Sequence, residues 1–160
     1  MKFSFKIHKN KKNPKKLLIL DRDGVIIKDT GYPHEKDKII FEYNNINKIK
    51  SLYKKLKFNI CGIATNQSGV TRDFFSEDKF WECHNFIIEK CSLEGLNIYF
   101  TAVNFFKSNS YYRKPNSGMI DQTSLFYKIK KENIMFIGDK KSDEEAAKNA
   151  NVCFEYINKI

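Results

Sequence analysis

The first residues that could do chemistry are a pair of carboxylates. Asp21 and Asp23 stand two positions apart, directly after the apolar run Leu17–Leu20. Clustered carboxylates repel one another, which raises their pKa values unless a cation binds. One carboxylate can act as a nucleophile and form an aspartyl-phosphate. The other can protonate a leaving oxygen and later deprotonate water. The pair alone is weak evidence, because it also occurs in surface turns.

The elements that must position these residues alternate between strands and helices. Strands are expected at residues 16–20, 59–64, 96–103, 133–139 and 152–156. Helices are expected at about 45–57, 76–91, 117–131 and 143–149, with Asn44 or Asn45 capping the first and Ser76 the second. This order predicts an α/β fold, a three-layer Rossmann-like parallel sheet with helices on both faces.

Polar residues follow three of the expected strands. Ligands of such sheets bind at the carboxyl ends of the strands, so Asp21, Thr65 and Asp139 should meet at one edge. An all-oxygen site with few protein ligands suits Mg²⁺, which usually bridges to a substrate phosphate. Lys114 and the Thr65 hydroxyl can stabilise a phosphoryl group in transfer. The set therefore predicts Mg²⁺-dependent phosphoryl transfer.

The positive charge is concentrated at the N-terminus. The chain has 160 residues, enough for one domain, and a net charge of +10. Residues 1–16 hold seven lysines and no acid, so they account for most of that charge. We expect a basic arm at residues 1–13 and a single domain at 14–160. Apolar and polar residues alternate in "KFSFKIH", so an edge strand is the alternative to a flexible arm. Nucleic acid is not expected as a partner.

Several functional classes are not expected from the composition. No apolar run is long enough for a membrane-spanning helix, and no signal peptide is evident, so a cytoplasmic protein is expected. The four cysteines form no CxxC pair and read as free thiols. His84 lies on the apolar face of its predicted helix and reads as a core residue rather than a metal ligand.

Four segments of the chain resemble the motifs of haloacid-dehalogenase-type phosphatases. They are "LLILDRDGVI", "IATNQSGV", "YRKPNSGM" and "MFIGDKKSDEEAA". The similarity is greatest to the D-glycero-D-manno-heptose 1,7-bisphosphate phosphatases and the related histidinol-phosphate phosphatases. The features that indicate this branch are the tripeptides at residues 21–23 and 113–115, "TNQSG" at 65–69 and "DTGYPHE" at 29–35. The resemblance covers about residues 17–152.

The resemblance implies a role for each matching position. Asp21 would be the nucleophile and a Mg²⁺ ligand, and Asp23 the general acid and base, with its backbone carbonyl on the metal. Asp139 would be the third metal ligand, and Asp143 would orient Lys114 or a metal-bound water. The residues implied to stabilise the phosphoryl group are Thr65, Arg113 and Lys114. Those implied to contact substrate are Asp29, Thr30, Gly31, Tyr32, Asn66, Gln67, Ser68 and Lys140.

The chain departs from this branch in one loop. Relatives commonly carry a zinc-binding loop before the Arg-Lys-Pro tripeptide, but residues 101–112, "TAVNFFKSNSYY", contain neither Cys nor His. No structural zinc is therefore expected, and the exact substrate is left open. We expect the shortened loop to be packed by Phe105, Phe106, Tyr111 and Tyr112. No insertion is long enough for a cap domain, so an open site and a monomer are expected.

The leading functional hypothesis is a Mg²⁺-dependent phosphatase of a small phosphorylated metabolite. D-glycero-D-manno-heptose 1,7-bisphosphate is the favoured substrate, and histidinol phosphate is the alternative. A nucleic-acid 3′-phosphatase is less favoured, because the Asp-x-Asp-Gly-Thr motif and larger companion domains are absent. A basic binding module with relic carboxylates is disfavoured, because every catalytic position holds a competent residue.

Overall fold

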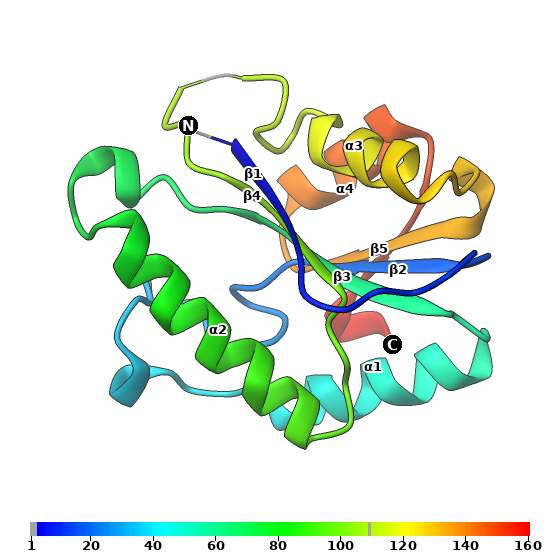
Figure 1. Ribbon diagram of the computed structural model, residues 1–160, viewed down its shortest axis with the longest axis horizontal. Helices are drawn as coiled ribbons and strands as arrows, with labels where there is room; N and C mark the ends of the chain where they lie inside the picture. Colours follow the sequence, from blue (N-terminus) through cyan, green and yellow to red (C-terminus); the bar gives the residue numbers. More distant parts are fainter. Residues whose placement is uncertain (1–2, 109) are drawn as a thin grey trace.

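The apolar runs of the chain pair into one mixed sheet, which organises everything around it. The structure is a computed structural model and describes residues 3–108 and 110–160. Within these residues the sheet has six strands in the order β1-β4-β3-β2-β5-β6 (Figure 1). The strands are β1 (Phe3–Ile7), β2 (Leu17–Leu20), β3 (Ile60–Asn66), β4 (Phe100–Asn104), β5 (Ile134–Gly138) and β6 (Cys153–Tyr156).

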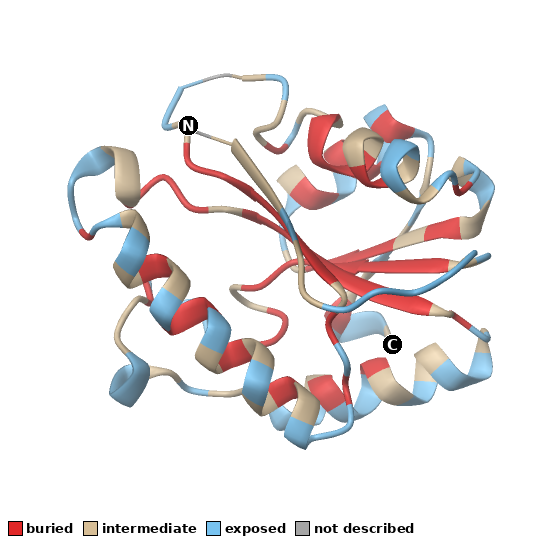
Figure 2. Ribbon diagram, viewed as in Figure 1, coloured by how far each residue is buried: buried red, intermediate tan, exposed pale blue. Residues whose placement is uncertain are grey.

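The central strand β2 has both faces in the core. Its four residues are fully buried (Figure 2). Their side chains alternate between the two faces of the sheet. Leu18 and Leu20 pack in the cluster that includes residues of α1 (Tyr43–Lys55) and α2 (Glu77–Leu93). Leu17 and Ile19 pack with α3 (Gly118–Tyr127) and α4 (Lys141–Ala150). The predicted α/β three-layer fold is therefore confirmed.

Helix boundaries differ from the prediction where local contacts compete. Ser76 caps α2 as predicted, because its side chain accepts a hydrogen bond from the backbone N–H of Lys79 at 3.1 Å. The prediction that Asn44 or Asn45 caps α1 is wrong, since the helix begins at Tyr43. Asn45 instead donates to the carbonyl of Val25 at 3.1 Å. Helix α3 ends at Tyr127, before the left-handed Lys128.

Strand β3 runs two residues further than predicted. Thr65 and Asn66 are its last residues and are in register with Val103 and Asn104 of β4. The polar side chains of both residues are thus held by a strand rather than by the loop that follows. The connections after β2 and β3, residues 21–42 and 67–76, contain only the short 3-10 turns Lys36–Lys38 and Val70–Arg72. These two connections, which are described throughout, therefore contain no cap domain.

The N-terminal segment requires a correction. Residues 3–7, which we expected in a separate basic arm at 1–13, form β1 and pair antiparallel with β4. Phe5 stacks on Phe100 with ring centroids 5.5 Å apart and contacts Phe126 at 5.1 Å. The alternating pattern of this segment therefore produces the edge strand that the sequence left open. Among the described helices, none is both long and apolar enough to cross a membrane.

We predict that β1 contributes to stability. Phe5→Ala should lower the free energy of unfolding by about 2 kcal/mol, because a half-buried ring is lost from the apolar face of the strand. Lys6→Ala on the same strand should cost less than about 1 kcal/mol, because only a cation–π contact with Trp81 is removed. Urea unfolding of both variants measures the difference. Equal small effects would show that the strand is not docked in solution.

Candidate active site

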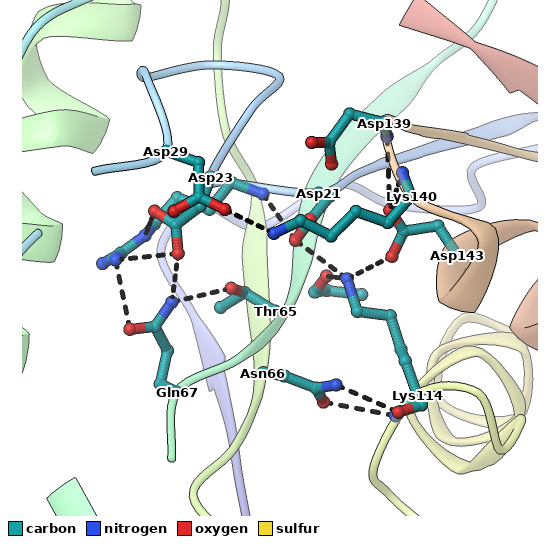
Figure 3. A network of polar contacts seen from close by, with 12 residues as sticks. Asp21, Asp23, Asp29, Thr65, Asn66, Gln67, Lys114, Asp139, Lys140 and Asp143 are labelled. Atoms are coloured by element: carbon teal, nitrogen blue, oxygen red, sulfur yellow. Dashed lines mark hydrogen bonds and ion pairs between the residues drawn. The ribbon is translucent and has the colours of Figure 1, made fainter. Parts of the chain in front are cut away.

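A buried ammonium group between two aspartates forms the centre of the site (Figure 3). The Nζ atom of Lys114 lies 2.8 Å from Oδ1 of Asp21 and 2.6 Å from Oδ1 of Asp143. It also donates to the carbonyl of Ala64 in β3 at 3.1 Å. Asp21 follows β2, Lys114 lies between β4 and α3, and Asp143 lies in the first turn of α4. The ion group therefore joins elements that are far apart in the sequence.

Burial changes the proton affinity of this group. It raises the pKa of Asp21 to about 7, although Lys114 opposes the shift, and Asp143 adds to it. Burial alone would lower the pKa of Lys114, but attraction by both carboxylates outweighs it and leaves that pKa above its ordinary value. Lys114 therefore stays charged. Asp21 is a poorly solvated and more basic carboxylate, which suits a nucleophile.

Asp139 completes an oxygen cluster that suits a cation. Asp21, Asp139 and Asp143 each offer one oxygen, and these oxygens lie within 4.8 Å of one another. Oδ1 of Asp139 is buried and has no hydrogen-bond partner among the described residues. Burial raises the pKa of Asp139, and the nearby Asp143 adds to the shift. An unpartnered carboxylate oxygen beside a second carboxylate is the donor set that a hard divalent cation prefers.

The contacts of Asp143 give it a different role from Asp139. Its Oδ1 faces Lys114, and its Oδ2 accepts hydrogen bonds from the backbone N–H groups of Asp139 at 3.2 Å and Lys140 at 3.1 Å. Both oxygens are thus engaged with the protein. Asp143 is therefore placed to orient Lys114 and the turn that carries Asp139, while Asp21 and Asp139 have oxygens available for a metal.

Gly24 permits the close approach of Asp139. Its φ is +87°, a left-handed conformation that favours glycine. A Cβ atom at this position would lie 2.1 Å from Oδ2 of Asp139. The turn after β2 can therefore pass beside the carboxylate only without a side chain at residue 24.

Asp23, two residues after Asp21, accepts hydrogen bonds from a second set of donors. Arg22 donates from Nε to Oδ1 of Asp23 at 2.9 Å and from Nη2 to Oδ2 at 3.2 Å. Gln67 donates to the same Oδ2 at 2.7 Å and to the Thr65 hydroxyl at 2.9 Å. Each aspartate of the motif thus has its own basic partner, Lys114 for Asp21 and Arg22 for Asp23.

Further contacts fix the residues around this centre. Asn66 and the backbone of Lys114 exchange two hydrogen bonds, at 3.1 and 3.2 Å. Arg113 donates to the carbonyl of Phe106 at 2.8 Å. Lys140 forms an ion pair with Asp29 at 2.5 Å across the mouth of the site, between the loop after β2 and the start of α4. A substrate phosphate that binds Lys140 would compete with this carboxylate.

The structure brings most of the predicted residues into one open pocket of about 270 Å³. Its lining residues are Asp21, Asp23, Thr65, Asn66, Ser68, Arg113, Lys114, Lys140, Ser142 and Asp143. Thr30 and Tyr32 line a separate cavity of about 330 Å³. Gly31 lies in the exposed loop and donates its backbone N–H to Asp29 at 2.9 Å. Asp29 reaches the pocket through its contact with Lys140.

Two residues near this pocket were not predicted from the sequence. Ser142 lines it, and Arg22 is fully buried beneath it. The signal for Arg22 was available, because a charged residue between two aspartates at the end of a buried strand needs an internal partner. Gln67 was predicted to contact substrate, but its side chain is buried and bonded to Asp23 and Thr65.

The loop after β4 is packed only in part by the expected aromatic residues. Phe105 is buried and lies edge-on to Phe80, with centroids 5.2 Å apart. Tyr112 stacks on Phe3 at 3.7 Å. Tyr111 is exposed, and its hydroxyl donates to Asp121 at 2.7 Å. The expectation is therefore wrong for Tyr111. The absence of structural zinc stays a prediction.

Comparisons with known proteins identify a family for this chain. A family model described as polynucleotide kinase 3 phosphatase matches residues 16–156. The D-glycero-alpha-D-manno-heptose-1,7-bisphosphate 7-phosphatase of Burkholderia mallei is 33% identical over 84% of this chain and 75% of its own. The D-glycero-beta-D-manno-heptose-1,7-bisphosphate 7-phosphatase of Helicobacter pylori is 34% identical over 88% of this chain and 82% of its own.

Solved structures show the same architecture. The D,D-heptose 1,7-bisphosphate phosphatase from B. bronchiseptica, complexed with magnesium and phosphate, superposes with a TM-score of 0.72 at 26% identity. The match covers 86% of this chain and 77% of that one. A HAD-like protein from Mesorhizobium loti has a TM-score of 0.84 at 24% identity, over 94% of this chain and 76% of that one, which supports the fold alone. The chain therefore belongs to the polynucleotide kinase 3 phosphatase family, and it is a phosphatase of the haloacid-dehalogenase type.

Proposed function

We propose that this protein removes the 7-phosphate of D-glycero-D-manno-heptose 1,7-bisphosphate, with Mg²⁺ and through an aspartyl-phosphate on Asp21. The observation that carries the chemistry is Asp21 itself, a buried carboxylate between the Lys114 ammonium and an unpartnered oxygen of Asp139. The named substrates of the relatives support the choice of sugar. We further propose a cytoplasmic monomer in carbohydrate metabolism that needs no structural zinc.

The geometry supports a two-step transfer. In the first step an oxygen of Asp21 attacks phosphorus, the bond from phosphorus to the ester oxygen breaks, and Asp23 gives its proton to the departing oxygen. In the second step water attacks the aspartyl-phosphate, Asp23 takes the proton of that water, and the bond from phosphorus to Asp21 breaks. The products are the alcohol and inorganic phosphate, and both aspartates return to their starting states.

Residues of two segments would hold the phosphoryl group during this transfer. Lys114 and Arg113 lie on the connection after β4, and Thr65 lies at the end of β3. Their cationic and hydroxyl groups can bind the equatorial oxygens as charge shifts. Asp21, Asp139 and the backbone carbonyl of Asp23 would hold Mg²⁺. When bound, the ion would neutralise part of the negative charge of the phosphate and of the two carboxylates.

Two other substrates define the alternatives. Histidinol phosphate is the alternative from the resemblance, and a 3′-phosphate of nucleic acid is suggested by the description of the family model. The lysines of residues 9–15 line a cavity of about 760 Å³. This cavity lies at the amino end of β2, whereas Asp21 follows its carboxyl end. The basic segment is therefore at the opposite edge of the sheet from the pocket, which disfavours a nucleic-acid substrate.

Replacement of the nucleophile should abolish turnover. We predict that Asp21→Asn lowers kcat by about 1,000-fold or more, because an amide is a poor nucleophile and removes one charge from the metal site. Phosphate release under saturating Mg²⁺ measures the effect. Asp37→Asn, an exposed change in a surface turn, is the matched control and should retain full activity. Turnover by Asp21→Asn near that of the parent protein would exclude the proposed mechanism.

A substrate panel tests the choice of sugar. Heptose 1,7-bisphosphate should show the highest kcat/KM, above histidinol phosphate and a 3′-phosphorylated oligonucleotide, because the small open pocket lies away from the basic segment. Phosphate release is measured for all three at the same Mg²⁺ concentration. A preference for the oligonucleotide would overturn the sugar assignment but leave the aspartyl-phosphate chemistry in place.

Gly24→Ala should weaken the binding of Mg²⁺. The new Cβ would displace Asp139, so we expect half-maximal activity to need at least about tenfold more Mg²⁺, corresponding to about 1.4 kcal/mol. Gly95→Ala is the matched control, because its φ of +80° carries similar backbone strain and its nearest atom would be Cε of Lys50 at 3.7 Å. The same Mg²⁺ requirement in both variants would show that Asp139 is not a ligand.

A further inference from the structure

The side chain of Asp23 has three of its hydrogen-bond acceptor positions filled. Oδ1 accepts from Nε of Arg22, and Oδ2 accepts from Nη2 of Arg22 and from Nε2 of Gln67 (Figure 3). A carboxylate has about four such positions, two on each oxygen. Oδ2 is thus saturated, and one position remains on Oδ1. The exchangeable proton of Asp23 can therefore be carried by Oδ1.

Arg22 is itself fixed in the interior. Its side chain is fully buried, and the two hydrogens of Nη2 are shared among Oδ2 of Asp23, the carbonyl of Pro33 and Oε1 of Gln67, the last two at 3.1 Å. The guanidinium lies 5.4 Å from the ring centroid of Phe80. A planar guanidinium with several fixed partners has little rotational freedom. Arg22 is therefore a rigid support beneath Asp23.

The amide of Gln67 can adopt one orientation here. Its Oε1 accepts from Arg22, so its Nε2 must face Asp23 and Thr65. The two hydrogens of Nε2 are both used, one for Oδ2 of Asp23 and one for the Thr65 hydroxyl. The side chain is also buried, with only 3% of its surface exposed. Gln67 therefore has no donor left for a substrate.

We propose that Arg22 and Gln67 are positioning residues for Asp23, and that they direct Oδ1 toward the departing oxygen. This inference rests on the proposed function, in which Asp23 donates the proton that the leaving alcohol receives. Since Gln67 also bonds the Thr65 hydroxyl, it links the proton donor to a group that holds the phosphoryl oxygens. Gln67 then acts through Asp23 and Thr65, and not through a contact with the sugar.

A series of aryl phosphates with different leaving groups tests this role. Proton donation matters most when the departing oxygen is strongly basic, and general acid catalysis contributes about 10² to 10⁴-fold. We expect Gln67→Leu to lower kcat/KM for phenyl phosphate by about 10-fold or more, and for p-nitrophenyl phosphate by less than about threefold. The quantity kcat/KM covers the steps up to departure of the alcohol, so hydrolysis of the aspartyl-phosphate does not affect it.

Matched variants separate positioning from other effects. Gln122→Leu makes the same change in α3, outside the pocket, and should leave both substrates unaffected. Gln67→Glu keeps the acceptor for Arg22 but removes the donor to Asp23, so it should show the same selective loss. It replaces Gln67→Leu in the test if that variant folds poorly. Arg22→Lys should show the same selective loss, because a single ammonium group cannot replace the several N–H donors of the planar guanidinium. Circular dichroism and urea unfolding confirm folding.

The outcomes distinguish this inference from the proposed function. If the parent protein releases no phosphate from any aryl phosphate or from the sugar, the proposed function fails. If the parent is active and Gln67→Leu lowers kcat/KM equally for both aryl phosphates, Gln67 does not position the proton donor, and the inference is overturned. A loss confined to the heptose substrate would instead restore Gln67 as a sugar contact and also overturn it.

Discussion

The buried ion group of Lys114, Asp21 and Asp143 is the constraint on which the rest of the structure depends. Removing charges from water costs several kcal/mol for each ion, and only good geometry with further hydrogen bonds compensates this. Here the ammonium has two carboxylates and the Ala64 carbonyl, and Asp143 has two backbone donors. Such a group forms only when β2, β3, the connection after β4 and the first turn of α4 are all in place. Formation of the fold and formation of the site therefore depend on the same set of ion pairs and hydrogen bonds.

The same group leaves an imbalance that matters for function. One ammonium faces Asp21 and Asp143, and Asp139 adds a third carboxylate whose Oδ1 is unpartnered among the described residues. Burial raises the pKa values of Asp21 and Asp139, and the neighbouring carboxylate of Asp143 adds to both shifts, although Lys114 and Lys140 oppose them. The proposed divalent cation would reduce the repulsion among these carboxylates and would help to bind a phosphate. The site can therefore form without a metal, but its carboxylate charges are not fully balanced by cationic side chains. This remaining negative charge favours the binding of a metal ion.

Much of this arrangement could be predicted from the sequence, and the failures share a cause. The alternating apolar runs and the polar residues after them are local signals, so the sheet, the capping by Ser76 and the meeting of Asp21, Thr65 and Asp139 could be inferred. The wrong expectations depend on contacts distant in sequence. Residues 3–7 pair with β4, about a hundred residues away, and Asn45 bonds the carbonyl of Val25 instead of capping a helix. The substrate contact expected for Gln67 follows from the resemblance and stays a prediction, but the burial of its amide between Arg22 and Asp23 could not be read from the motif.

The two aspartates of the motif are tolerated side by side because each has a separate cation. Lys114 faces Asp21 from the connection after β4, and Arg22 faces Asp23 from the motif itself. Most of their mutual repulsion is therefore balanced by the protein, and a metal is not needed to hold the pair together. The proposed metal ion would therefore serve the reaction rather than hold this pair together. In the proposed mechanism this division also separates the two chemical tasks, because Lys114 contacts the proposed nucleophile and Arg22 contacts the proposed proton donor. Each carboxylate therefore has its own set of contacts although the two residues are only two positions apart, so that one can be altered without the other.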